Sequence, residues 1–150
     1  MVIVLLGLAA LGAYLIMSMG SDASGIPTTG TLNASQLATL ASNAGFSDQD
    51  LATAVAIALA ESGGKISAYN PEKAAGAAQG KGSYGLWQIY ITAHPEYTAD
   101  MLLDPQTNAE AAYKIYESRG ETFAAWSTYT SGAYLAHADA AQSATGFSVA

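Results

Sequence analysis

The hydrophobic pattern first separates an unbroken apolar run at the N-terminus from a periodic remainder. The run from Val2 to Met19 carries no charge, and its length is close to the ~20 residues that cross a bilayer as a helix. A buried core helix and a cleaved signal peptide are the alternatives, but a signal peptide needs a positively charged start and a small-residue cleavage site. We therefore expect a transmembrane helix over 1–20, followed by a Gly-, Ser- and Pro-rich linker over 21–32.

Helical periodicity begins near Asn33, so that 33–150 is expected to form one domain. A short helix is predicted to end at Gly45. A longer one is predicted to begin at Ser47, with Asp50 completing a capping-box arrangement. Apolar residues then recur at i, i+3, i+4, i+7 and i+8, which defines one buried face: Leu51, Ala54, Val55, Ala58 and Leu59. The next residue of interest, Glu61, lies on the flank of this face, just before two glycines end the helix.

The second half of the domain combines one extended element with further helices. A glycine-rich loop is expected after the long helix, and the aromatic and β-branched residues of 84–91 predict a short strand or hairpin. Asp104 and Pro105 are typical of a helix start, and Gly120 of its end. Thr122 is predicted to begin a final helical region. The predicted fold class is therefore mainly α, with a small β element in an α+β domain.

Composition and charge narrow the function classes. Five Lys and Arg residues stand against twelve Asp and Glu, which gives a net charge of −7, and nothing basic precedes Lys65. Nucleic-acid binding needs cationic surface, so it is not expected. The chain has no cysteine and two histidines, which excludes disulfides and thiolate metal sites and leaves too few ligands for a zinc site without carboxylate help. No metal or cofactor is expected.

Four short motifs occur in a fixed order along the domain. Glu61-Ser62 closes a helix, G-S-Y-G-L-W-Q-I spans 82–89, N-A-E-A-A begins at Asn108, and W-S-T-Y-T-S-G spans 126–132. This set resembles the lysozyme-like domain of lytic transglycosylases of the soluble-transglycosylase type, over roughly residues 33–138. The resemblance implies a lysozyme-like fold and cleavage of the MurNAc–GlcNAc β-1,4 bond of peptidoglycan.

The chain departs from the family pattern in two places. Trp87 stands where a methionine is usual, and Tyr129-Thr130-Ser131-Gly132 replaces the usual Tyr-Asn-Ala-Gly. The tyrosine and the glycine of that motif are kept, while its asparagine is missing.

Glu61 is the candidate catalytic acid. Protonating a glycosidic oxygen near neutral pH requires a carboxyl group whose pKa is raised. The C-terminus of a helix and an apolar flank both disfavour the carboxylate, whereas Lys65 would oppose the shift if it folded back. A solvated glutamate at a helix end is the alternative that position alone leaves open.

The resemblance also implies roles for other residues. Glu61 would act first as acid and then as base, and Tyr129 would lie near it as a second catalytic residue. The substrate's N-acetyl group and 6-hydroxyl would replace a second carboxylate and water, giving a 1,6-anhydro product; no partner acid is obvious in the sequence. The expected substrate-binding residues are Ser62, Tyr84, Gly85, Leu86, Trp87 and Gln88. Of these, Gln88 either contacts sugar or ties the loop down, and Tyr84 and Trp87 either stack on sugar or pack in the core.

Two other functions stay open at this point: a hydrolytic muramidase, and a structural virion or envelope protein that keeps the fold without catalysis. Similar sequences look like phage-associated wall-degrading enzymes. We expect a single-pass membrane-anchored chain, in a phage virion membrane or in a bacterial inner membrane facing the periplasm. Its expected partners are peptidoglycan glycan strands, lipid through 2–19 and other virion or membrane proteins.

Overall fold

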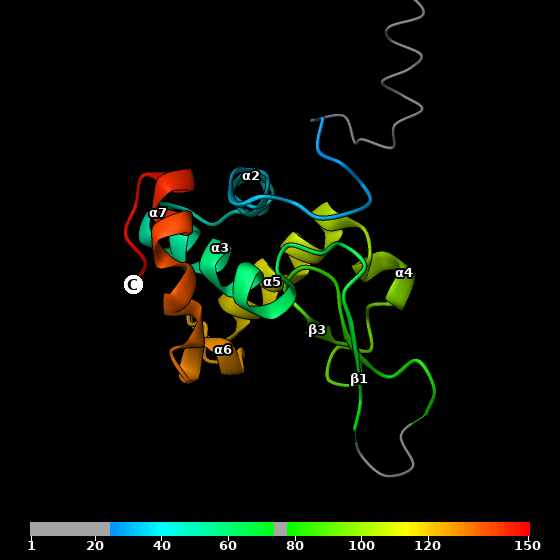
Figure 1. Ribbon diagram of the computed structural model, residues 1–150. Coiled ribbons are helices and arrows are strands. Elements are labelled where there is room, and N and C mark those ends of the chain that lie inside the picture. The colour runs from blue at the N-terminus through cyan, green and yellow to red at the C-terminus, as the bar shows by residue number, and fades with distance from the viewer. Residues whose placement is uncertain (1–24, 74–77) are drawn as a thin grey trace, which may run out of the picture.

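A computed structural model describes residues 25–73 and 78–150 and shows helices gathered around a central helix, with a small sheet to one side (Figure 1). In chain order the elements are α2 (Ala34–Ala44), α3 (Asp48–Ser62), β1 (Tyr69–Pro71), β2 (Gly82–Tyr84), β3 (Ile89–Tyr90), α4 (Ala99–Leu102), α5 (Pro105–Ser118), α6 (Ser127–Thr130), the 3-10 helix η1 (Ala133–His137) and α7 (Ala138–Thr145). The predicted fold class, mainly helical with a small β element, is confirmed.

The described segment before α2 packs against the domain. Ile26 and Leu32 are both buried in the core. The backbone N–H of Leu32 donates to the carbonyl of Gly64 at 2.8 Å. The described part of the predicted linker over 21–32 therefore packs on the domain, which extends further toward the N-terminus than the sequence pattern indicated.

The predicted transmembrane helix over 1–20 lies outside the described residues. Within the ranges that the structure does describe, no helix is both long and apolar enough to cross a membrane.

Helix α3 lies at the centre of the domain and contacts α2, α6, η1 and α7 (Figure 1). Every residue from Ala52 to Ala58 is buried, so the helix is surrounded on all sides and not only along the predicted face. Its many alanines make this possible, because small side chains let the neighbouring helices approach closely. The first turn of the helix and its last turn, which contains Glu61, leave the core at the two ends.

Two predicted helix boundaries are confirmed by their hydrogen bonds. Gly45 ends α2 with a positive φ of 126°. Asp104 is the N-cap of α5 and accepts the backbone N–H of Thr107 at 2.8 Å, with Pro105 as the first helical residue. Helix α5 ends at Ser118 with Arg119 as its C-cap residue, and the predicted stop, Gly120, follows with a φ of 78°.

The start of α3 at Ser47 is confirmed, but the capping box predicted there and the helix start predicted at Thr122 are wrong. Ser47 is the N-cap of α3, but its side chain makes no capping hydrogen bond. Asp50 does not complete a capping box, because its carboxylate accepts a 2.6 Å hydrogen bond from the phenol of Tyr116. Thr122 does not begin a helix either: α6 starts after Trp126, and Gly132, with φ of 78°, separates α6 from η1.

The sheet has the order β1-β2-β3, with antiparallel neighbours. The short strand or hairpin predicted over 84–91 is a hairpin of β2 and β3, joined by the turn 85–88, and it begins two residues earlier than predicted, at Gly82. Strand β1 was expected to be loop, and it forms through its pairing with β2. The register places Asn70 opposite Ser83, and Ser83 opposite Tyr90. Directly opposed residues point to the same side of a sheet, so these three form one row.

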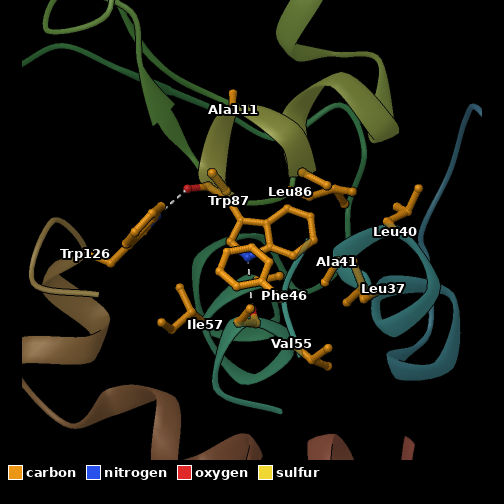
Figure 2. Packing of buried hydrophobic residues seen from close by; sticks show 14 of the residues in the cluster. Leu37, Leu40, Ala41, Phe46, Val55, Ile57, Leu86, Trp87, Ala111 and Trp126 are labelled. Atoms are coloured by element: carbon orange, nitrogen blue, oxygen red, sulfur yellow. Dashed lines mark hydrogen bonds between the residues drawn. The ribbon is translucent and has the colours of Figure 1, made fainter. Parts of the chain in front are cut away.

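Two buried tryptophans connect the hairpin turn to the helices (Figure 2). The indole N–H of Trp87 donates to the carbonyl of Ala54 in α3 at 2.9 Å. The indole N–H of Trp126 donates to the carbonyl of Trp87 at 2.8 Å. These bonds fix the hairpin, α3 and the start of α6 relative to one another.

A buried asparagine holds the same turn from the side of α5. The side-chain oxygen of Asn108 accepts the N–H of Trp87 at 2.8 Å, and its amide nitrogen donates to the carbonyls of Tyr84 and Leu102 at 2.9 Å. Gly85 has a φ of 77°, and a Cβ there would collide with the Asn108 amide and the Leu102 carbonyl. The turn can therefore pack against α5 only with glycine at this position.

Candidate active site

A groove of about 370 Å³ opens where α3 ends. Its walls come from segments that are distant in the sequence: the sheet, the turn after β3, the end of α5 and the approach to α6. The lining residues are Glu61, Asn70, Ser83, Gln88, Ile89, Tyr90, Ala93, His94, Ile115, Arg119, Ala125, Trp126 and Ser127. Among these described residues, Glu61 is the one carboxylate.

Glu61 is half-buried in the last turn of α3, on the groove. Burial raises the pKa of its carboxyl group above the ordinary value of 4.5, and hydrogen bonds from the side chain and backbone of Thr128 offset part of the rise. The Thr128 hydroxyl donates to Oε1 at 2.7 Å. The last turn of α3 contains no basic residue that would favour the carboxylate. The net shift in the pKa of Glu61 is thus upward, which is the direction that proton donation requires.

Lys65 does not counteract this effect. It is exposed, and in the part of the chain that the structure describes it forms no ion pair with Glu61. Gly63 and Gly64 both have positive φ, and they lead the chain into a β-bridge between Lys65 and Thr31. The turn at the two glycines therefore places Lys65 outside the groove, whereas Glu61 lines it.

The sheet supplies the wall with the most varied chemistry. The row of Asn70, Ser83 and Tyr90 lines the groove, and the Tyr90 side chain is 36% exposed. This row offers an amide, a hydroxyl and an aromatic face from three neighbouring strands. Such a combination suits a sugar, which presents hydroxyl groups at its edge and C–H groups on its faces.

Gln88 lies on the groove and also holds the hairpin turn. Its amide nitrogen donates to the carbonyls of Gly85 at 2.9 Å and Ala68 at 3.2 Å. Its backbone has a positive φ of 50°, which is unusual for a non-glycine residue. Gln88 therefore ties the loop down, which is one of the two roles that the sequence left open. Both of these bonds use its side-chain nitrogen, and neither uses its side-chain oxygen.

The remaining walls contribute groups that the sequence did not single out. His94 lines the groove and contacts Glu96 at 3.3 Å through Nδ1. Ile115 and Arg119 face the groove from the end of α5, and Ser127 from the start of α6. These four residues come from three separate segments, so their convergence depends on the tertiary structure.

Several predicted binding residues support the groove from behind. Leu86 and Trp87 are 0% and 1% exposed, and neither side chain has surface available to a ligand. Tyr84 is buried and its phenol donates to the carbonyl of Gly80 at 2.7 Å. Gly85 is buried against Asn108, as described above. Of the hairpin residues predicted to bind substrate, Gln88 is the one that lines the groove.

Ser62 caps its own helix. Its hydroxyl donates to the carbonyl of Ala58 at 2.9 Å and accepts the N–H of Gly64 at 3.1 Å. These bonds satisfy groups at the end of α3 and fix the turn that follows Glu61.

Tyr129 packs against two other aromatic rings. Its ring lies 5.6 Å from the ring of Phe123 and 5.0 Å from that of Tyr134, measured between centroids. Within the described part of the chain, no hydrogen bond joins it to Glu61, and the preceding residue, Thr128, takes that position. The motif pointed to the correct one-turn helix, but only the way Trp126 anchors α6 decides which of its residues faces Glu61.

No group of three or more histidine or acidic side chains that could hold a metal ion occurs within residues 25–73 and 78–150.

Comparison with known protein families assigns the segment that forms this groove to one family. A family model described as "Lysozyme like domain" matches residues 38–128, which is more than half of the chain. The matched segment includes Glu61, the hairpin, Asn108 and Thr128. No curated protein and no solved structure matches the chain. The match confirms the lysozyme-like part of the resemblance found in the sequence.

Proposed function

Since the chain belongs to the lysozyme-like domain family, we propose that it is a lytic transglycosylase that cleaves the MurNAc–GlcNAc β-1,4 bond of peptidoglycan. Membership of the family supports a peptidoglycan-cleaving enzyme in general. The observation that carries the finer proposal is Glu61: a half-buried carboxyl group with a raised pKa, held by Thr128 at 2.7 Å, on the edge of a groove.

In the proposed reaction, Glu61 begins protonated and donates its proton to the glycosidic oxygen as the bond from that oxygen to C1 of the muramoyl residue breaks. The N-acetyl carbonyl of the same residue stabilises the positive charge that develops at C1. The Glu61 carboxylate then accepts the proton of the 6-hydroxyl, and O6 bonds to C1. The product carries a 1,6-anhydroMurNAc end, no water is consumed, and Glu61 returns to its protonated form.

The number of carboxylates at the groove supports this substrate-assisted route. Glycosidases that use two carboxyl groups hold them roughly 5–10 Å apart across the scissile bond. Glu61 is the one carboxylate among the described residues that line the groove. A hydrolytic muramidase would need a further acid to activate water.

The sheet row and Gln88 are the proposed contacts with the glycan. The exposed face of Tyr90 would stack on a sugar ring, while Asn70 and Ser83 would bond to its polar substituents. The amide oxygen of Gln88 is an acceptor for an N-acetyl N–H. Tyr129 stays a predicted catalytic residue, and Ser62, Tyr84, Gly85, Leu86 and Trp87 would act on binding by shaping the groove.

Digestion of purified peptidoglycan, followed by mass spectrometry of the strand ends, tests the proposal. We expect anhydro ends from the wild type and loss of cleavage of at least about 100-fold in Glu61→Gln. Glu117→Gln, which removes an exposed carboxylate from α5, is the matched control and should cleave normally. Hydrated reducing ends would indicate a muramidase, and equal cleavage by Glu61→Gln and the wild type would exclude Glu61 from the mechanism.

We further propose that residues 2–19 anchor the domain in a membrane, either of a phage particle or of a bacterial cell on its periplasmic side. The uncharged apolar run supports this. Alkaline extraction of membranes is the test: the wild-type chain should remain in the pellet, and the double variant Leu11→Lys, Leu15→Lys should be released. Release of the wild type would contradict the anchor.

A further inference from the structure

Arg119 is the one arginine of the chain, and it lines the groove that contains Glu61. It ends α5 as its C-cap residue and is exposed to solvent. Although the chain has a net charge of −7, no acidic side chain in the described residues forms an ion pair with it. A strongly acidic protein thus presents its single guanidinium, without an ion-pair partner, in the groove where the substrate is proposed to bind.

The position of Arg119 follows from helix geometry. Ile115 lies one turn earlier on α5, at i−4, and lines the same groove. The stripe of α5 that faces the groove therefore ends in this guanidinium. Lys114 belongs to the same helix and is exposed, but it is not among the lining residues. Cationic character on the groove side of α5 is thus specific to Arg119.

The chemistry of a guanidinium narrows what this residue binds. Its planar fork pairs with carboxylates through two parallel hydrogen bonds, and it gains far less from neutral hydroxyl and acetamido groups. In a glycan strand of alternating N-acetyl sugars, the anionic groups are carried by the 3-O-lactyl substituent of the muramoyl residue. This substituent ends in a free carboxylate or continues into a peptide that bears carboxylates.

Resting on the proposed function, we propose that Arg119 is a specificity-determining residue that binds a carboxylate on the 3-O-lactyl substituent of a muramoyl residue. The bound substituent marks the muramoyl sugar and distinguishes it from its GlcNAc neighbours. Arg119 thereby selects which sugar lies at each position of the groove, and strands that carry carboxylates bind better than neutral ones.

The test compares the full-length wild type with Arg119→Gln, Arg119→Lys and the control Lys114→Gln. Soluble strands are prepared with their peptides or without them, and each preparation is also amidated so that its carboxylates are neutral. We expect amidation to raise the KM of the wild type about tenfold, with a much smaller change in kcat. Arg119→Gln should lose this preference, Arg119→Lys should keep part of it, and Lys114→Gln should behave as the wild type.

The source of the carboxylate follows from the two preparations. A preference confined to peptide-free strands assigns it to the lactyl group, and one confined to peptide-bearing strands assigns it to the peptide. A preference of equal size in Arg119→Gln and the wild type would overturn the proposal, as would a wild type that does not distinguish amidated strands.

Binding measurements separate this proposal from that of the enzyme activity. The affinity of the same four strand preparations is measured for Glu61→Gln and for the double variant Glu61→Gln, Arg119→Gln. A tenfold preference for carboxylate-bearing strands that disappears in the double variant supports the role of Arg119 even if the wild type cuts nothing. Cleavage by the wild type without any such preference supports the enzyme activity and contradicts the role of Arg119.

Discussion

The hydroxyl of Thr128 donates a 2.7 Å hydrogen bond to Oε1 of Glu61, across 67 positions of the sequence. This contact joins the end of the central helix α3 to the one-turn helix α6. It acts against burial, because it lowers the pKa of Glu61 while burial raises it. The bond therefore holds the carboxyl group of Glu61 in one orientation and limits how strongly it retains its proton.

Replacing Thr128 by valine should change both the rate and its pH dependence. The variant Thr128→Val removes a hydrogen bond that favours the carboxylate, so the pKa of Glu61 rises further. Because the reaction begins with protonated Glu61, the fall in kcat/KM at alkaline pH should move to higher pH. Loss of orientation should lower kcat about tenfold at the optimum. Thr128→Ser, which keeps the hydroxyl, should retain the wild-type profile; an unshifted profile in the valine variant would contradict this role.

The raised pKa of Glu61 also predicts how stability depends on pH. A carboxyl group whose pKa is higher in the folded chain than in the unfolded chain binds more protons when folded, so stability falls as pH rises above the ordinary value of 4.5. Glu61→Gln removes this cost and keeps an acceptor for Thr128. Its Tm should exceed that of the wild type by about 2 °C at neutral pH, after allowance for solvent screening. The difference should shrink below pH 4.5; a constant difference in thermal scans would mean that ionisation is not its cause.

Glu61 could be found from the sequence because its signals are local. The apolar helix, its end at two glycines and the serine after the acid all lie within a few residues. Thr128 could not be found in this way. Residues of a four-residue helix have no periodicity to assign their faces, and only the anchoring of Trp126 on Trp87 decides that Thr128 meets Glu61.

The hairpin shows a similar limit. Aromatic and β-branched residues predicted its strands, but an apolar side chain in a turn suits both a core and a sugar-binding surface. Trp87 is buried because Asn108 draws its backbone against α5. Asn108 carried a usable signal, since it precedes Ala111, Ala112 and Ile115 at helical spacing, and a polar residue in an apolar stripe often bonds to buried backbone. Strand β1 was missed because it has only three residues and contains Pro71, and because it exists through its pairing with β2.

The three hydrogen bonds of the Asn108 side chain, here called the Asn108 clamp, predict a large loss of stability when this side chain is truncated. Asn108→Ala would leave the buried N–H of Trp87 and the carbonyls of Tyr84 and Leu102 without their partner. Unsatisfied buried groups cost about 1–3 kcal/mol each, so we expect a loss of at least about 3 kcal/mol in the free energy of unfolding. Chemical denaturation measures it, with the exposed Glu110→Ala on the same helix as control. A loss no larger than that of the control would show that the clamp contributes little.

Tyr90 should contribute to substrate affinity through its aromatic face. It lines the groove in the row with Asn70 and Ser83, whereas Tyr69, 44% exposed, stacks on Tyr84 and is not among the lining residues. Stacking on a ring gains about 0.5–1.5 kcal/mol, so Tyr90→Ala should raise KM roughly threefold to tenfold with little change in kcat. Tyr90→Phe keeps the ring and should behave as the wild type, and Tyr69→Ala should leave KM unchanged. Equal effects of the alanine variants at Tyr90 and Tyr69 would point to a general effect on the sheet, because only one of these two rings lies on the groove.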